Sequence, residues 1–138
     1  MKAVLDASTI ITLVKRHGEE SIEILEGSTT IALAPYEIGN TLRTETQLTL
    51  ALTNTEADRL LYILYRILTV VTMETPTTAE DAITILNTAR ETDASYYDAA
   101  YLTEAKKMGL PLATEDRRLA DKAEKFSVKT VNAESLSQ

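Results

Sequence analysis

The chain has no cysteine, no tryptophan and only one histidine, and these absences exclude several kinds of site. Without cysteine there can be no disulfide, no thiolate zinc site and no cysteine nucleophile. This composition fits a reducing compartment, so we expect a cytoplasmic protein. The lone histidine, His17, lies in the charged stretch "KRHGEE", which is typical of a solvated helix end. A histidine-based catalytic triad or metal site is therefore not expected.

Long hydrophobic runs are also missing. The longest, "LLYILYRILTVV" at residues 60–71, contains Arg66 and is too short to cross a bilayer. The first ten residues, "MKAVLDASTI", do not have the form of a secretory signal. We therefore expect a soluble protein with no membrane partner.

Basic residues are in the minority. The chain has 14 Lys and Arg against 21 Asp and Glu, which gives a net charge of −7. This balance argues against a protein that binds nucleic acid through a broad basic surface. If the protein binds nucleic acid, local groups must offset the repulsion between its negative charge and the phosphates.

Short apolar runs alternate with helical patterns along the 138 residues, enough for one domain with its own core. Strands are expected at residues 2–6, 29–35, 69–73, 110–114 and 127–131. Helices are expected at residues 8–18, 21–27, 36–52, from 55 onward, 77–93, 95–108 and 116–126. The alternation predicts an α/β protein, a three-layer α/β/α domain around a mainly parallel sheet of four to five strands.

Local signals refine these boundaries. The segment "TEAD" at residues 55–58 has the form of a capping box, and Thr77 followed by Glu80 has the same spacing, so each is expected to begin a helix. Residues 1–132 are expected to form the single domain, and residues 133–138 a short polar C-terminal tail.

Four acidic residues fall where such a sheet would place a site, since ligands of parallel α/β sheets bind outside the carboxyl ends of the strands. They are Asp6, Glu37, Asp98 and Asp116. Helix capping explains any one of them. Four carboxylates at one edge, however, would repel one another, and such a group usually holds a metal. Because only oxygen ligands are available, the ion would be Mg²⁺ or Mn²⁺.

The surroundings of these acids favour a site. Asp98 shares a helical stripe with Tyr101, Leu102 and Ala105, which should pack on the sheet and turn the carboxylate inward. Three polar residues stand two or three positions from an acid: Ser8, Asn40 and Thr114. Capping and turn formation are the alternative explanation for Ser8 and Thr114.

Four segments, in this order, resemble the motifs of the PIN domain: "VLDAS" with Asp6 and Ser8, "YEIGN" with Glu37 and Asn40, "YYDAAYL" with Asp98, and "LATEDRRL" with Thr114 and Asp116. More narrowly, the chain resembles VapC-type toxin ribonucleases of toxin–antitoxin pairs, over essentially its whole length. The resemblance implies an Mg²⁺- or Mn²⁺-dependent endoribonuclease that cuts single-stranded or loop RNA. The four acids would be its catalytic metal ligands, and the three polar residues would support them.

The resemblance also implies partners, namely a cognate antitoxin and a second copy of the chain in a homodimer. In such an enzyme, one or two cations activate a water and neutralise the phosphate that it attacks. Further RNA contacts would come from basic residues near the acids in sequence, for which the candidates are Lys15, Arg16, Arg117 and Arg118.

Two other classes of function remain open. A Mg²⁺-dependent phosphatase or phosphotransfer domain also places acids at strand ends, although "LDAST" lacks the second acid that such a site normally needs. In a non-catalytic acidic binding module, the carboxylates would be caps and the apolar helix at residues 60–71 the functional surface. That helix carries Tyr62 and Tyr65 and is either buried or an interface.

Overall fold

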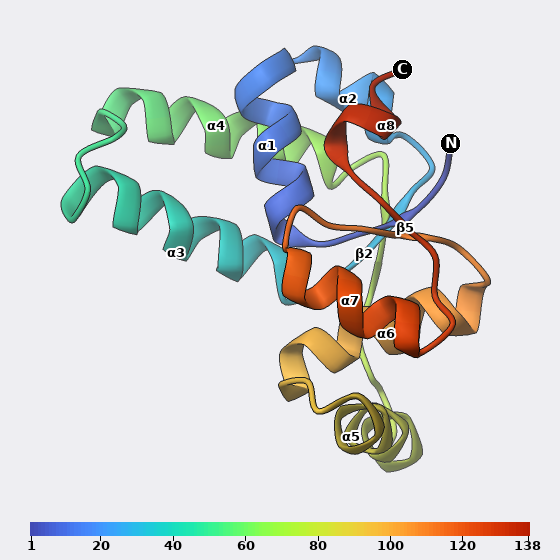
Figure 1. Ribbon diagram of the computed structural model, residues 1–138. Coiled ribbons are helices and arrows are strands. Elements are labelled where there is room, and N and C mark those ends of the chain that lie inside the picture. The colour runs from blue at the N-terminus through green and yellow to red at the C-terminus, as the bar shows by residue number, and fades with distance from the viewer.

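The computed structural model describes all 138 residues and has five parallel strands with helices on both faces of the sheet (Figure 1). The strands are β1 Val4–Leu5, β2 Thr29–Ile31, β3 Thr72–Glu74, β4 Leu112–Ala113 and β5 Thr130–Val131. The helices are α1 Ala7–His17, α2 Glu20–Leu25, α3 Ala34–Gln47, α4 Asn54–Ile67, α5 Ala79–Thr92, α6 Tyr96–Met108, α7 Arg117–Lys125 and α8 Ala133–Leu136. The predicted three-layer α/β/α class is confirmed.

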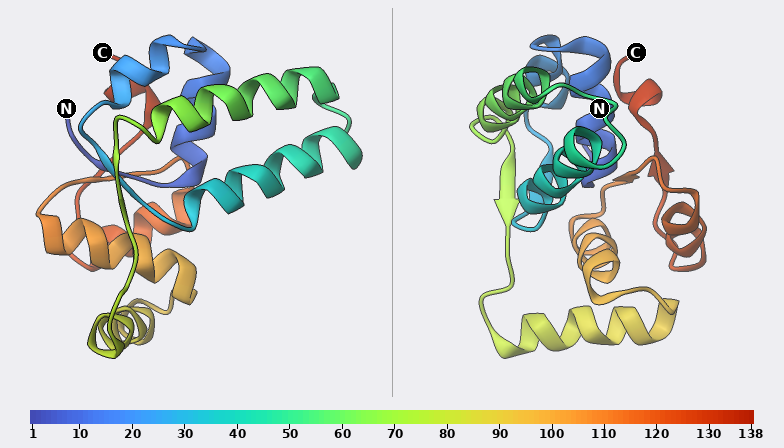
Figure 2. Two further views of the ribbon diagram at one scale, coloured as in Figure 1. Left: turned by 180° about the vertical axis from the view of Figure 1, so that it is seen from behind. Right: turned by 90° about the vertical axis from the view of Figure 1, so that its left-hand side faces the viewer.

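The strand order, β3-β2-β1-β4-β5, places β1 at the centre of the sheet. Helices α1, α2 and α4 pack together on one face, where α8 also contacts α1. Helix α6 packs on β1, β2 and β4 on the other face, α7 lies beside β5, and α5 packs on α6 (Figure 2). The paired helices α3 and α4 project from the body of the domain (Figure 1).

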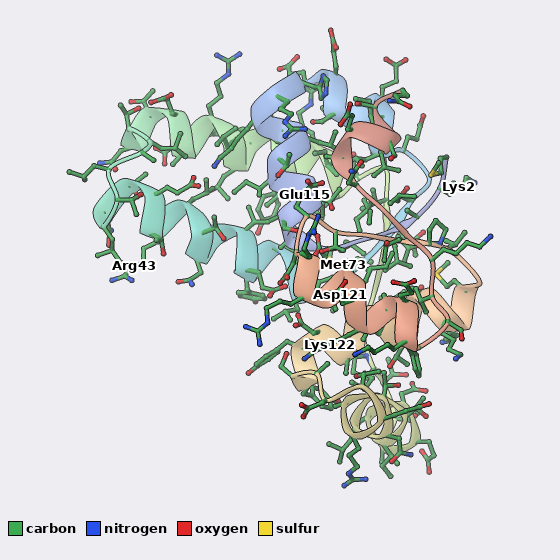
Figure 3. All side chains as sticks on the ribbon, viewed as in Figure 1. Lys2, Arg43, Met73, Glu115, Asp121 and Lys122 are labelled. Carbon is green, nitrogen blue, oxygen red and sulfur yellow. The ribbon has the colours of Figure 1, made fainter.

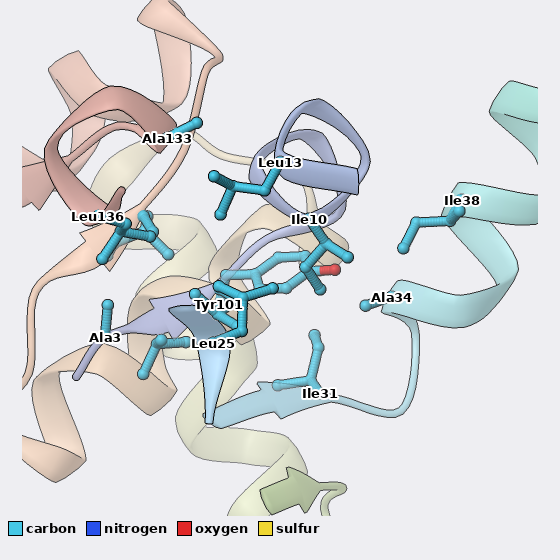
Figure 4. Packing of buried hydrophobic residues seen from close by; sticks show 14 of the residues in the cluster. Ala3, Ile10, Leu13, Leu25, Ile31, Ala34, Ile38, Tyr101, Ala133 and Leu136 are labelled. Carbon is cyan, nitrogen blue, oxygen red and sulfur yellow. The ribbon is translucent and has the colours of Figure 1, made fainter. Parts of the chain in front are cut away.

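The core forms around the central strand because its residues are apolar on both faces. Val4 and Leu5 are fully buried, as expected for a parallel strand covered by helices. The stripe of α6 that should face the sheet is buried too, with Tyr101 1% exposed. Figure 4 shows the ring of Tyr101 among core residues of α1, with its hydroxyl turned toward α3. The tyrosine thus joins the core to the carboxyl edge of the sheet.

The helix starts differ from the expected capping positions by one or two residues. Thr53 and Glu56 form the capping box of α4, two residues before "TEAD". Helix α5 is capped by Thr78, whose hydroxyl accepts from the N–H of Asp81, one residue after the expected pair. Each place in the sequence offers two threonines with an acid three residues later, so the pattern fits two registers.

The apolar helix predicted around residues 60–71, expected to be either buried or an interface, is buried on one side and exposed on the other. Ile63, Leu64 and Ile67 of α4 are buried, whereas Tyr62 and Tyr65 are 78% and 60% exposed. One side of α4 is therefore part of the core, and its tyrosines lie at the surface. None of the eight helices has both the length and the apolar character that a membrane span requires.

Residues 133–138 are not a polar tail, contrary to the expectation from sequence. They include α8, whose Ala133 and Leu136 are 1% and 7% exposed and belong to the core. Two apolar residues in four are too few to show a helical period, which is why the sequence did not reveal this helix.

Replacing Asn132 by Ala should lower the free energy of unfolding by about 1 kcal/mol, because it removes the N-cap of α8. The Asn132 side chain accepts a 2.9 Å hydrogen bond from the N–H of Ser135. Urea unfolding measures the change, with Gln138→Ala, beyond the helix, as the control. A loss no larger than that of the control would mean that the cap does not stabilise the fold.

Candidate functional site

The four acidic residues that were predicted to form a site lie in four different elements, at or near the carboxyl ends of strands. Asp6 directly follows β1, and Asp116 follows β4, the neighbouring parallel strand. Glu37 lies in the first turn of α3, which follows β2. Asp98 lies in the first turn of α6, which packs on these strands. The topology therefore brings the ends of β1, β2 and β4 to one edge.

Asp6 is buried, with only 5% exposed, and it caps α1. Its Oδ1 accepts hydrogen bonds from the Ser8 hydroxyl at 2.7 Å and the Thr9 N–H at 2.9 Å. Burial raises the pKa of Asp6, while hydrogen bonding by Thr114, Ser8 and Thr9 offsets part of that rise. The site thus holds Asp6 in place but disfavours its negative charge.

Asp116 is exposed and caps α7, with Oδ1 accepting from the N–H groups of Arg118 at 2.9 Å and Leu119 at 3.3 Å. The expected supporting residues join the two strand ends. Thr114 Oγ1 accepts from the N–H of Asp116, and Ser8 Oγ accepts from the N–H of Glu115, both at 3.0 Å. Ser8 therefore links the loop after β4 to Asp6.

Glu37 does not cap its helix but is held by a tyrosine. The hydroxyl of Tyr101 donates a 2.6 Å hydrogen bond to Glu37 Oε1. Burial raises the pKa of Glu37, the bond from Tyr101 lowers it, and the charges of Asp98 and Asp6 raise it further. Burial and the Glu37 carboxylate together raise the pKa of Tyr101 far above its usual range, so this hydroxyl remains a hydrogen-bond donor.

Asp98 is not a cap either. Ser95 caps α6, and Asp98 contributes only its N–H, which donates to Ser95 Oγ at 3.1 Å. Burial raises the pKa of Asp98, the charge of Asp116 raises it further, and Lys122 and Arg118 oppose the rise. Capping therefore explains Asp6 and Asp116, but it does not explain Glu37 or Asp98.

A small pocket of about 220 Å³ joins two of the acids to two cations. It is lined by Ser95, Asp98, Asp116, Arg118, Leu119 and Lys122. Lys122, labelled in Figure 3, lies on α7, and its Nζ donates a 2.6 Å hydrogen bond to the carbonyl of Asp93, the residue that ends α5. Carboxylates and cations thus meet in one concave place, where the carboxylates would hold a metal ion and the cations would contact a phosphate.

The four side chains suit a hard cation by chemistry but do not form a ready cage. No group of three Asp, Glu, His or Cys side chains lies close enough together to hold an ion. Oδ1 of Asp6, Oδ1 of Asp116 and Oε1 of Glu37 take the hydrogen bonds described above. The second oxygen of each of these carboxylates accepts none of these hydrogen bonds. Carboxylate oxygens are hard ligands, which suit Mg²⁺ or Mn²⁺.

Of the four basic residues predicted to contact RNA, two lie near the acids and two do not. Arg118 lines the small pocket and Arg117 is exposed beside it. Lys15 and Arg16 lie in the last turn of α1, roughly 13 Å along the helix from Asp6 at 1.5 Å per residue. Lys15 is paired there with Glu45 at 2.6 Å. The structure therefore does not bring Lys15 and Arg16 to the acids.

Asn40 lies one turn after Glu37 on α3, is exposed and makes no hydrogen bond through its side chain. Two residues of the site were missing from the sequence prediction, Tyr101 and Lys122. A tyrosine in an apolar stripe was a usable signal, because a buried phenol needs a partner. For Lys122 the only signal was its position four residues after Arg118, on the same helix face.

No known family model matches the sequence, and no curated protein matches it. Among solved structures, the chain is similar to one described as "PAE2754 from Pyrobaculum aerophilum", with a TM-score of 0.77. The two share 24% sequence identity, and the match covers 99% of this chain and 92% of that one. At this identity the similarity shows a common fold.

Proposed function

We propose that the protein is a Mg²⁺- or Mn²⁺-dependent endoribonuclease that cleaves single-stranded or loop RNA in the cytoplasm. One observation carries the proposal: four carboxylates from four separate elements lie at or near the carboxyl ends of neighbouring parallel strands. Asp6 and Asp98 both raise the pKa of Glu37, and Asp116 raises that of Asp98. Repulsion between carboxylates lowers the stability of the fold, whereas a bound cation attracts each carboxylate and stabilises the fold.

The order and spacing of the motifs around these acids support a narrower proposal, that the protein is a PIN domain ribonuclease of the VapC type. As the toxin of a toxin–antitoxin pair, it would form a homodimer and be inhibited by a cognate antitoxin. The surface tyrosines of α4, Tyr62 and Tyr65, are available for one of these contacts.

In this reaction the side chains of the protein would bind the cation and position the phosphate of the RNA. Asp6, Glu37, Asp98 and Asp116 would hold the cation, and the cation would supply an activated water and charge stabilisation at the phosphate. Tyr101 fixes the Glu37 carboxylate by donating to Oε1, and Ser8 and the cap of α1 fix Asp6. Arg118 and Lys122, which line the pocket with Asp98 and Asp116, would contact the phosphate.

The proposal is tested with purified protein and an end-labelled single-stranded RNA in Mn²⁺, Mg²⁺ or EDTA. We expect cleavage with either cation and none with EDTA. Millimolar Mn²⁺ should also raise the melting temperature, because a ligand that binds only the folded state stabilises it. At a concentration 100 times the dissociation constant, this stabilisation is about 2.7 kcal/mol.

The melting experiment separates the proposal from its alternatives. A non-catalytic module whose acids are caps predicts an unchanged melting curve and intact RNA. A phosphatase predicts Mn²⁺ stabilisation with release of phosphate from a phosphomonoester and no internal cleavage. Either result would replace the nuclease proposal.

A further inference from the structure

Two exposed tyrosines stand immediately before two of the four acids. Tyr36 precedes Glu37 in the first turn of α3 and is 79% exposed, and Tyr97 precedes Asp98 in the first turn of α6 and is 60% exposed. The hydrogen bond from Tyr101 to Glu37 ties α6 to the start of α3. Both aromatic rings therefore project from the turns that carry the acids.

The fold does not account for these rings. Neither hydroxyl makes a hydrogen bond, and both rings remain largely in water. Tyr97 also lines a cavity of about 610 Å³ between α5 and α6, which extends to Leu33 after β2 and Glu74 at the end of β3. This hollow reaches the carboxyl ends of β2 and β3 and continues along α6 to Lys107, and a flat ligand has room to lie in it beside Tyr97.

The charge of the chain limits how RNA can be held near this edge. The protein carries a net charge of −7, and the two cations that line the small pocket are Arg118 and Lys122. Few phosphate contacts give little electrostatic affinity. Stacking of bases on aromatic rings does not depend on charge, and it is a common source of affinity for single strands.

We propose that Tyr36 and Tyr97 are base-stacking residues that hold unpaired bases of a single-stranded RNA beside the four acids. This inference rests on the proposed nuclease function and names the means by which its substrate is bound. Stacking on a side chain requires an unpaired base, so the two rings favour single strands and loops over duplexes. Because every base has a flat face, the preference for sequence that they impose is weak.

The test measures binding of a fluorescein-labelled single-stranded RNA of 12 nucleotides by fluorescence anisotropy, at several salt concentrations with Mn²⁺. Every protein carries Asp98→Asn so that the RNA stays intact. Tyr36→Ala and Tyr97→Ala should each weaken binding about fivefold or more, with the salt dependence unchanged. Tyr36→Phe and Tyr97→Phe should bind as well as the parent, because they keep the ring.

Matched controls come from α4, where Tyr62 and Tyr65 are 78% and 60% exposed. Tyr62→Ala and Tyr65→Ala should leave binding unchanged. A second measurement uses RNAs in which single bases are replaced by abasic sites. One abasic position should weaken binding to the parent but have little further effect on the variant that lacks the matching ring.

The outcomes distinguish the two proposals. If wild-type protein cleaves RNA, but Tyr36→Ala and Tyr97→Ala bind as the α4 controls do, stacking is wrong and the nuclease proposal stands. Equal losses in all four alanine variants would also overturn stacking at the site. If RNA is neither bound nor cut with Mn²⁺, the nuclease proposal fails and the stacking proposal fails with it.

Discussion

Replacing Asp98 by Asn should reduce metal-dependent RNA cleavage by roughly 100-fold or more, as expected when a group that stabilises charge in the transition state is lost. The same change should raise the melting temperature of the metal-free protein at pH 7. Both effects follow from the position of Asp98, whose pKa is raised by burial and by the charge of Asp116. Function and stability therefore change in opposite directions.

The pH dependence of the stability follows from the raised pKa of Asp98. The folded state binds a proton more tightly than the unfolded state does, so this group favours folding most below its unfolded pKa. That contribution is lost as the pH rises through the folded pKa. The advantage of Asp98→Asn should therefore be full at pH 7 and disappear near pH 3. Because Asp98 is only half-buried, screening by water limits the gain to less than about 1 kcal/mol, or roughly 2–4 °C.

Thermal melts of wild type and Asp98→Asn at pH 3, 5 and 7, with and without Mn²⁺, check this prediction. With saturating Mn²⁺ the order should reverse, since wild type gains more from the ion. Asp121→Asn is the matched control, because Asp121 is exposed on α7 (Figure 3). If Asp98→Asn melts below wild type without metal at pH 7, the Asp98 carboxylate stabilises the fold, and the prediction that burial and the charge of Asp116 make it destabilising is wrong.

Replacing Tyr101 by Phe should lower kcat/KM by roughly 10-fold and the free energy of unfolding by about 1.5–3 kcal/mol, because a hydrogen bond to a charged acceptor is lost. The ring is retained, so the core that surrounds Tyr101 keeps its packing. The bond from Tyr101 lowers the pKa of Glu37. Without it that pKa rises, and the acidic limb of the pH–rate profile should move to higher pH.

Steady-state cleavage across pH 5–9 and urea unfolding measure these effects, with Tyr62→Phe on the exposed face of α4 as the control. A structural role alone would lower stability and leave the pH profile in place. An unmoved profile with unchanged kcat/KM would therefore show that Tyr101 does not position Glu37 for the reaction.

The sequence contained most of the fold because its strands are short, continuous apolar runs between helical patterns. Strand ends could be located to within a few residues, and this sufficed to select Asp6 and Asp116. Strand length could not be predicted, because apolar residues beside a strand, such as Leu33, belong to connections and helix starts. The buried α8 was missed because it is shorter than any reliable period.

The site was less predictable than the fold, since side-chain directions depend on local bonds. Sequence reasoning brings four acids to one edge, but capping bonds fix the carboxylates of Asp6 and Asp116. This is a physical reason why no three acids form a ready metal group. Lys15 follows Asp6 by nine positions, and only the straight course of α1 shows that it lies at the far end. Partners from other elements, such as Tyr101, require the three-dimensional structure.

The pairing of β1 with β4 also determines when the site can form during synthesis. Val4 lies beside Leu112, so the centre of the sheet joins segments that are 108 positions apart in the sequence. Contacts so distant in sequence are slow to close during folding. Asp6 and Asp116 can therefore meet only after the segment that contains β4 and Asp116 has left the ribosome. A nascent chain has no complete site, and a chain truncated before β4 would have none at all.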